Sequence, residues 1–330
     1  MPSRNRHVIA VVVLVPVLAA LALWAFAWPA SRIAPRDLPL GVAGPPAAAA
    51  QVEKQLERHE GAFEIHRYAD EAAARDAIKD RSVYGAVVVT GQGPELLTAS
   101  AAGPVVAQFL QQAVGQQAAA GGTQVRTVDV VPAPAADPRG AVLNAAALPL
   151  SLAGIAAGAL VTLLGLRGIR AGLALLGASA LVGVVAAGIA HSWLGALGGD
   201  WWAEAGVLGL STLAVGGAVA GLAALLGTAG IGIGAAVVML LGNPFSGATS
   251  APQMLPEPVG AIGQWLPPGA GTTLLRSVSF FDGAAATGPA LTLAWWAALG
   301  LGAVLLGSSL RARKADAEPA ADHRELSAVG

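Results

Sequence analysis

The stretch VIAVVVLVPVLAALALWAFAW, residues 8–28, places this protein in a membrane. It carries no charged side chain from end to end, and about 20 consecutive apolar residues suffice to cross the hydrocarbon core of a bilayer. A cleaved secretory signal is the alternative, because Ala25-Phe26-Ala27 resembles a signal-peptidase site. The apolar core of a signal spans only about 7–15 residues, whereas this run is longer and ends in bulky Trp28. An uncleaved membrane helix over 8–28, behind a short N-tail of residues 1–7, is therefore favoured.

The composition of the whole chain predicts several more membrane spans. Hydrophobic residues make up 55% of the 330 residues and charged residues 12%, whereas soluble domains carry about 25% charged residues. Apolar runs predict five further spans at Ala141–Leu166, Ala171–Ala190, Ala203–Leu226, Ala229–Gly242 and Gly288–Leu310. The run 229–242 is short for a span, because at 1.5 Å per residue it reaches only about 21 Å of a ~30 Å core. The predicted fold is a membrane α-helical bundle of six spans, five of them within residues 141–310.

Basic residues near the spans orient the bundle, because Lys and Arg concentrate in the short cytoplasmic flanks of membrane proteins. Arg4 and Arg6 precede the first span, Arg167 and Arg170 lie between the second and third, and a basic cluster follows the sixth. All of these lie on one side if the N-terminus is cytoplasmic, and the eight tryptophans then map to the opposite half. We therefore expect a multi-pass protein of the plasma or inner membrane with both termini in the cytoplasm.

Two segments outside the bundle have their own character. Residues 311–330 follow the last span, mix acidic with basic residues, and are predicted to form a disordered cytoplasmic tail. Residues 29–140 lie between the first two spans and are expected on the extracytoplasmic side.

Residues 29–140 show the alternation of a soluble α/β domain. Asp70 is a favourable N-cap for one of its helices. Runs of apolar or β-branched residues predict strands, and apolar residues on one helical face predict helices. The predicted strands are Leu38–Ala43, Phe63–Tyr68, Tyr84–Val89, Glu95–Ala99 and Gln124–Val131, and the predicted helices are Ala47–His59, Glu71–Asp80 and Pro104–Ala119. This βαβαββαβ order predicts a small sheet covered by helices, inserted between spans one and two.

Residues 243–287 form an apolar outer segment that several prolines interrupt. Short helices that dip into the outer leaflet are one interpretation, since such backbone is tolerated where protein or water satisfies it. An ordinary hydrophobic loop packed on the bundle is the other. The sequence leaves both open.

Signatures of catalysis and of cofactor binding are missing from the sequence. There is no G-x-S-x-G, no H-E-x-x-H and no Walker lysine loop, so we expect no enzyme, no cofactor and no metal site. His59 and His66 are a weak metal pair and are interpreted as solvated surface residues. The net charge of −1 gives no electrostatic reason to expect nucleic acid as a partner. The lipid bilayer is the first partner that the sequence predicts.

Small residues inside the predicted spans favour close helix packing. Gly154 and Gly158, as well as Gly217 and Gly221, have the small-xxx-small spacing that lets helix backbones approach each other. The spans otherwise offer only hydroxyl and amide side chains. Ion-coupled transporters generally keep acidic, basic or histidine side chains inside the membrane, so an antiporter is not expected. If the protein moves a substrate, a partner nucleotidase has to supply the energy.

The architecture and two segments resemble the membrane subunit of ABC-2-type exporters, in particular the phage-infection-protein-like branch. Residues 243–283, NPFSGATSAPQMLPEPVGAIGQWLPPGAGTTLLRSVSFFDG, are similar to the Pro-rich outer region between spans five and six of that family. Residues 70–89, DEAAARDAIKDRSVYGAVVV, resemble its outside domain, in which a helix leads into a strand.

The resemblance implies an exporter permease that moves an amphipathic, lipid-like or drug-like substrate with a separate ATPase, possibly as a homodimer. The candidate residues of the substrate pathway lie in the Pro-rich segment and are Asn243, Pro244, Ser246, Gly247, Pro256, Trp265 and Pro267. The inner loop around Arg167–Arg170 is shorter than the coupling helix on which such an ATPase docks. The alternative is therefore a non-transporting membrane protein whose outside domain binds a partner, as a cell-surface accessory factor or a phage receptor does.

Overall fold

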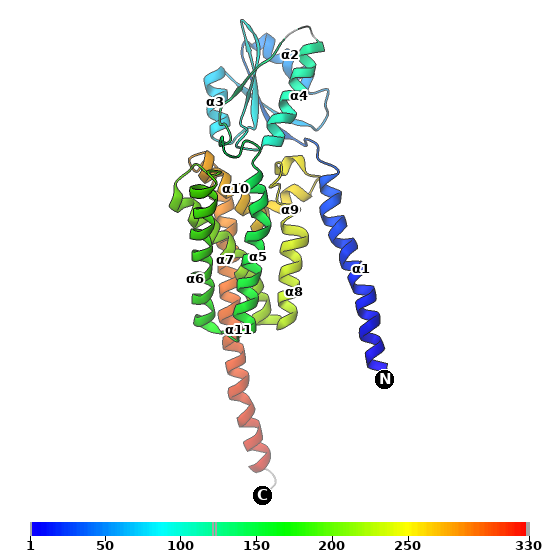
Figure 1. Ribbon diagram of the computed structural model, residues 1–330, viewed down its shortest axis with the longest axis vertical. Coiled ribbons are helices and arrows are strands. Elements are labelled where there is room, and N and C mark those ends of the chain that lie inside the picture. Colours follow the sequence, from blue (N-terminus) through cyan, green and yellow to red (C-terminus); the bar gives the residue numbers. More distant parts are fainter. Residues whose placement is uncertain (1, 121, 123, 328–330) are drawn as a thin grey trace.

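The computed structural model describes residues 2–120, 122 and 124–327 and has two parts stacked along its long axis (Figure 1). An α/β region, residues 38–129, lies at one end, and a helical bundle lies below it. Both the N-terminal end of α1 (Pro2–Ala30) and the C-terminal end of α11 (Thr287–Ser327) point away from the α/β region. The end of the bundle next to the α/β region is called the domain end below.

The α/β region is built on a five-stranded mixed sheet. Its elements are β1 (Leu38–Ala43), α2 (Pro46–Leu56), β2 (Phe63–Tyr68), α3 (Glu71–Lys79), β3 (Gly85–Thr90), β4 (Gly93–Thr98), α4 (Pro104–Ala120) and β5 (Arg126–Asp129). The strand order is β2-β1-β3-β4-β5, with β1 parallel to β2 and β3, β3 antiparallel to β4, and β4 parallel to β5. Each strand and helix coincides with a predicted one to within a few residues at its ends.

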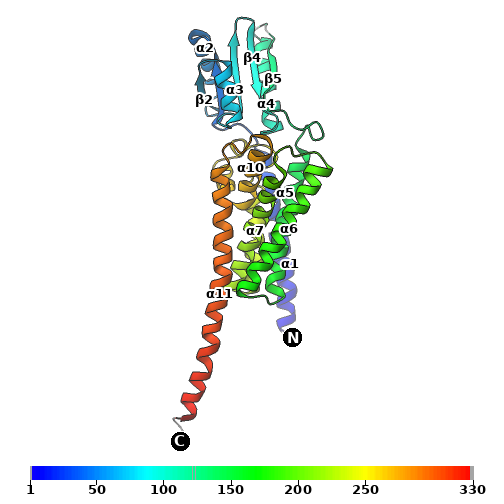
Figure 2. The same cartoon turned by 90° about the vertical axis from the view of Figure 1, so that its left-hand side faces the viewer.

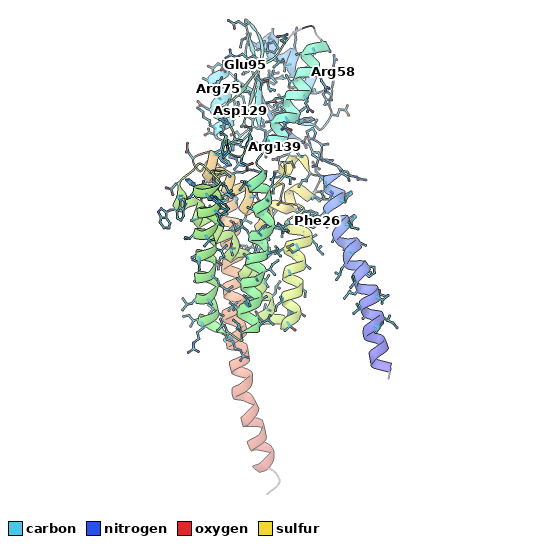
Figure 3. The ribbon with its side chains drawn as sticks, viewed as in Figure 1. Phe26, Arg58, Arg75, Glu95, Asp129 and Arg139 are labelled. Carbon is cyan, nitrogen blue, oxygen red and sulfur yellow. The ribbon has the colours of Figure 1, made fainter. Side chains whose placement is uncertain are left out.

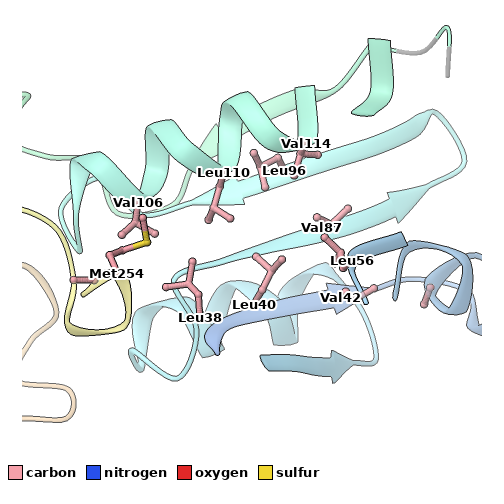
Figure 4. Close-up of a cluster of buried hydrophobic side chains, with 12 residues drawn as sticks. Leu38, Leu40, Val42, Leu56, Val87, Leu96, Val106, Leu110, Val114 and Met254 are labelled. Carbon is pink, nitrogen blue, oxygen red and sulfur yellow. The ribbon is translucent and has the colours of Figure 1, made fainter. Parts of the chain in front are cut away.

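Helices cover both faces of this sheet. On one face α2 and α4 pack against alternate strand residues, among them Leu38, Leu40 and Leu96, as the close-up in Figure 4 shows. On the other face Ala74, Ala77 and Ile78 of α3 pack against the opposite set. Because successive side chains of a strand point to opposite faces of the sheet, the strands contribute to a hydrophobic layer on each face. Asp70 caps α3 as predicted, since its carboxylate accepts a hydrogen bond from Ala73 N at 2.9 Å.

The charged surface of the protein gathers on the α/β region. Figure 3 labels Arg58, Arg75 and Asp129 there, whereas Phe26 projects from the apolar α1. Arg75 pairs with Glu71 at 2.6 Å, one turn earlier on α3. Exposed pairs of this kind contribute little to stability, but they mark a surface that lies in water.

The bundle is organised around one buried helix, α7. Its helices are α5 (Ala141–Leu163), α6 (Gly168–Ala187) with a π-helical extension η1 (Gly188–Trp193), α7 (Trp201–Leu226), α8 (Thr228–Ala236) with a π-helical extension η2 (Val237–Gly242), and α11. Helices α5, α6, α8 and α11, together with α10 (Pro267–Phe280), all contact α7, which Figures 1 and 2 show at the centre.

Glycines allow these close contacts, as predicted from their spacing. A Cβ on Gly158 would lie 2.5 Å from the Gly216 carbonyl oxygen of α7, and a Cβ on Gly300 would lie 2.2 Å from the Gly217 carbonyl carbon. Glycine thus sets the helix separation on both sides of α7.

Among the residues that the structure describes, five helices are long and apolar enough to cross a membrane: Val8–Ala30, Ala141–Leu163, Gly168–Trp193, Trp201–Leu226 and Thr287–Ser309. The remaining predicted span, 229–242, which is the fifth in chain order, corresponds to the shorter apolar helix Thr228–Gly242. It ends because Asn243 and Pro244 follow, and proline cannot continue the hydrogen-bond ladder of a helix.

The C-terminal tail differs from the prediction. Helix α11 continues from the apolar part to Ser327, so residues 311–327 are helical rather than disordered, while 328–330 lie outside the described residues. The physical reason is local: RARKADAEPAADHRELS is rich in Ala, Arg and Glu, which have high helix propensity, and it extends an existing helix.

The Pro-rich segment forms a helical hairpin at the domain end. After the short turn η3 (Pro252–Met254), α9 (Val259–Trp265) and α10 (Pro267–Phe280) meet at Leu266. The tip of this hairpin lies beside α11, because Trp296 Nε1 donates a hydrogen bond to the Trp265 carbonyl oxygen at 2.8 Å. Trp296 lies nine residues into α11, about 13 Å along its axis. The hairpin therefore runs alongside a candidate span instead of stopping at its end.

Helix α1 touches the remainder of the chain mainly at its C-terminal end. There Trp28 packs on Phe245, Leu255 and Val259 of the Pro-rich segment. Large side chains from Val8 to Leu23 are exposed, as on a helix that faces lipid.

Candidate functional site

Hydrogen bonds of polar side chains connect the parts of the Pro-rich segment to each other and to α5. Asn243 follows η2, and its Oδ1 accepts a hydrogen bond from Ser151 Oγ of α5 at 3.2 Å. Ser246 Oγ donates to the Asn243 carbonyl oxygen at 2.7 Å. Gln264 Nε2 of α9 donates to the Ser246 carbonyl oxygen at 3.1 Å, and Thr273 Oγ1 of α10 donates to Gln264 Oε1 at 2.6 Å. These bonds form a chain from α5 through the loop into both arms of the hairpin.

Arg276 of α10 holds the turn of the loop. Its guanidinium is 5% exposed and donates to the carbonyl oxygens of Gly247, at 3.5 Å, and of Ala248, at 2.5 Å. Gly247 has φ +67, and a Cβ there would lie 2.8 Å from Pro252 N, so both backbone conformation and space require glycine. Burial lowers the pKa of Arg276 to about 10, which leaves the side chain charged at neutral pH.

The α/β region docks on this segment through a polar joint. Arg81, just after α3, donates through Nη1 to the Thr273 carbonyl oxygen at 2.9 Å and to Ser277 Oγ. Tyr84 Oη donates to Gln253 Oε1 at 2.9 Å. Burial raises the pKa of Tyr84, so its hydroxyl remains a neutral donor.

Apolar contacts and main-chain bonds complete the joint. Ala251 and Met254 pack into the core under α2 and α4, and Figure 4 shows the Met254 side chain beside Val106. Arg36 N donates to the Gln253 carbonyl oxygen at 2.9 Å. Residues of the Pro-rich segment thus belong to two hydrophobic cores, one in the α/β region and one in the bundle.

An apolar groove of about 1120 Å³ opens between the hairpin and α11. Its walls are mainly aromatic and aliphatic, with Gln264, Thr273 and Thr292 as polar members. Trp265 and Trp295 are 75% and 66% exposed, so the groove is open to the surroundings of the bundle. A volume of this size accommodates a drug-sized molecule or one arm of a lipid.

The predicted pathway residues do not share one cavity. Trp265 lines the large groove, whereas Pro267 lines a separate cavity of about 40 Å³ against α5 and α7. Asn243, Ser246 and Gly247 hold the loop, as described above. The remaining two flank it: Pro244 is half-buried directly after Asn243, and Pro256 is buried, its carbonyl oxygen accepting from Val259 N at 2.8 Å.

Sequence reasoning misses the joint and one contact between a buried carboxyl group and a histidine. Arg81, Tyr84 and Gln253 carry no motif, although the bulky Arg81 at a position with φ +60 is unusual. The sequence gives Glu204 no partner, but it is fully buried in the first turn of α7, where it faces His191 Nδ1 at 2.7 Å. Its second oxygen accepts from Gly199 N at 3.0 Å. The bundle therefore does hold a buried carboxylate, at the domain end, where only hydroxyl and amide groups are expected from the sequence.

The arrangement suits the binding of an apolar ligand. The groove offers hydrophobic and aromatic contacts beside a membrane-length helix, and its polar members are neutral. Apolar burial in such a groove contributes affinity in proportion to the area removed from water.

Comparison with known proteins gives one match. Residues 6–134 match the family model described as ABC-2 family transporter protein, which covers nearly all of α1 and the whole α/β region. No curated protein and no solved structure matches the chain. The match agrees with the resemblance to ABC-2-type permeases, and with the apolar helices it identifies a multi-pass membrane protein. Residues 6–134 are therefore similar to the ABC-2 family of transporter proteins, and this match supports a membrane subunit of a transporter.

Proposed function

We propose that the chain is the permease of an exporter in the phage-infection-protein-like branch of the ABC-2 family, and that it moves an amphipathic, lipid-like substrate. The observation that carries this proposal is the open apolar groove between the α9–α10 hairpin and α11. Its wall includes three tryptophans, Trp265, Trp295 and Trp296, beside a candidate span. Aromatic side chains of this kind gather at the interface between lipid tails and headgroups.

The proposed topology follows from the charges at the two ends of the bundle. Arg167, just before α6, and Arg170, in its first turn, lie at the end of the bundle far from the α/β region. With that end in the cytoplasm, the α/β region is an extracytoplasmic domain and the hairpin dips into the outer leaflet. The short helix Thr228–Gly242 then serves as a sixth span, which the hairpin completes from the outer side.

The energy in this proposal comes from a separate ATPase, with which ABC-2 permeases typically work. Two copies of the chain, as a homodimer, would form the complete permease. A docking ATPase would reach the chain at the loop around Arg167 and at the helical extension of α11 beyond Ser309.

One observation favours a second function. The connection between α5 and α6 is short, from Leu164 to Arg167, and offers little surface to a nucleotidase. A membrane protein whose α/β region binds an extracellular partner, without transport, would need no such surface.

Transport in cells separates the two functions. The neighbouring reading frames are first searched for a P-loop ATPase, and the chain is then expressed with it. Two probes are followed: accumulation of Hoechst 33342 and outer-leaflet exposure of a fluorescent phospholipid. We expect transport of a probe to require the Walker lysine of the ATPase and to fall about tenfold in the double variant Trp265→Ala/Trp295→Ala, since each removes an aromatic face worth roughly 1 kcal/mol or more. The matched control Trp193→Ala removes an exposed tryptophan away from the groove. Probe movement that is the same with and without the active ATPase would favour the partner-binding function.

A further inference from the structure

Arg81 occupies a backbone position that folding alone would give to glycine. It directly follows Asp80, the C-cap of α3, and has φ +60. Arg81 N donates to the Ile78 carbonyl oxygen at 3.0 Å, and Ser82 N donates to the Ala77 carbonyl oxygen at 2.9 Å. This left-handed C-terminal pattern is normally closed by glycine, because a Cβ is disfavoured there. The reason for an arginine has to lie in its side chain.

The side chain of Arg81 leaves the α/β region and ends on the hairpin. Its Nη1 donates to the Thr273 carbonyl oxygen and to Ser277 Oγ, two positions one helical turn apart on α10. The guanidinium also lies 5.3 Å from the ring centroid of Phe281. Among the described residues, no carboxylate pairs with Arg81 or with Arg276. Arg81 is therefore held by neutral acceptors across the joint, and Arg276 by neutral acceptors within the Pro-rich segment.

The contact continues from Arg81 to the groove. Arg81 donates to the carbonyl oxygen of Thr273, and Thr273 lines the groove. The hydroxyl group of Thr273 donates in turn to Gln264, which also lines the groove. Gln264 in turn donates to the Ser246 carbonyl oxygen of the loop. A displacement of α10 relative to the α/β region would therefore move the polar members of the groove wall.

We propose that Arg81 is a positioning residue that latches the α/β region onto the α9–α10 hairpin and so holds the groove wall in place. This role of Arg81 goes beyond the proposed function, because it means that the α/β region controls the position of the hairpin. It does not depend on which substrate the groove takes.

The test measures opening of the joint in the full-length chain, in lipid nanodiscs. The chain has no cysteine, so a single introduced thiol is a clean reporter. Ser250→Cys, the joint reporter, places the thiol between the two parts, at a fully buried position whose carbonyl oxygen contacts Gly103. Val88→Cys, the strand reporter, places a buried thiol inside strand β3, where Val88 pairs with Glu95, toward the end of the sheet far from the joint. The rate of reaction with a maleimide is measured for each reporter in each background.

Arg81→Gly removes the latch and relieves the backbone at the same time. Since a guanidinium hydrogen bond shifts an opening equilibrium by about tenfold or more, we expect the joint reporter to react about tenfold faster and the strand reporter at an unchanged rate. Arg81→Lys, which keeps one cationic donor, should give an intermediate rate. The matched control Ala285→Gly relieves another positive φ, of 56, without touching the joint and should change neither rate.

Two results would overturn the proposal. An unchanged rate at the joint reporter in Arg81→Gly would show that the side chain does not hold the joint closed. A parallel rise at the joint reporter and the strand reporter would show that Arg81 only supports the fold of the α/β region. Neither readout needs a substrate or an ATPase, so a failure here is distinguishable from a failure of the transport proposal.

Discussion

Replacing Gly263 with alanine is expected to displace the α9–α10 hairpin from the loop that it packs against. A Cβ at this position would lie 1.7 Å from the Phe245 carbonyl oxygen, far inside the closest approach of real atoms. The clash is with backbone, so no side-chain rotation relieves it, and α9 has to move away from the loop. Overpacking of this kind costs about 3 kcal/mol or more. The expected result is a clear fall in the thermal midpoint of the purified full-length chain, together with loss of transport.

The control for this variant is Gly288→Ala in the first turn of α11, where nothing lies within 4 Å of the new Cβ. That change should leave the midpoint within about a degree, because alanine also has the better helix propensity. Equal midpoints for the two variants would mean that α9 does not pack against the loop at Phe245.

Loss of the Glu204 carboxylate is expected to destabilise the domain end of the bundle. Glu204 is fully buried and serves two partners, His191 Nδ1 and Gly199 N. Glu204→Ala leaves the Gly199 amide without its acceptor and the imidazole without its partner, which costs about 2–4 kcal/mol. The measurement is again the thermal midpoint of the full-length chain.

The matched variant Glu204→Gln keeps an oxygen that accepts from Gly199 N, so it should lose clearly less than Glu204→Ala. His191→Ala combined with each change gives a double-mutant cycle, in which the pair should show a coupling of about 1 kcal/mol or more. Additive effects would show that the two side chains do not act on each other.

The α/β region could be predicted in detail because its signals are local. Alternation in Phe63–Tyr68, the Asp70 cap and the apolar face of α3 all act within a few residues of each other. The order of strands in the sheet does not follow from such signals. It depends on which strands pair, and β1 lies between β2 and β3 because both crossover helices return the chain to the same sheet.

The joint could not be predicted, because its contacts connect distant parts of the chain. Arg81 and Thr273 are 192 residues apart, and nothing near either residue points to the other. Charged residues outside predicted spans are usually solvated. This expectation is wrong for Arg81 and Arg276, whose side chains lie within contacts between parts of the protein. The one local signal was Arg81 itself, at a helix end that favours glycine.

The candidate pathway was predicted at the level of the segment but not of each residue. The prolines marked residues 243–287 as irregular, and only Trp265 of the predicted set lines the large groove. The groove needs α11 as its second wall, and Trp295 and Leu299 looked like ordinary residues of a span. The packing of a hairpin against a span is a tertiary contact, and it leaves no periodic pattern in the sequence.

Single-cysteine labelling tests the proposed arrangement in the membrane most directly, since the natural chain has no thiol. Arg58→Cys lies on the exposed surface of the α/β region, where Figure 3 labels Arg58, and Arg170→Cys lies exposed at the opposite end of the bundle. In right-side-out membrane vesicles, a membrane-impermeant maleimide is predicted to label the Arg58→Cys variant at once and the Arg170→Cys variant only after permeabilisation. Labelling of the Arg170→Cys variant alone, or of both variants equally, in sealed vesicles would contradict a bundle that crosses the membrane with its α/β region outside.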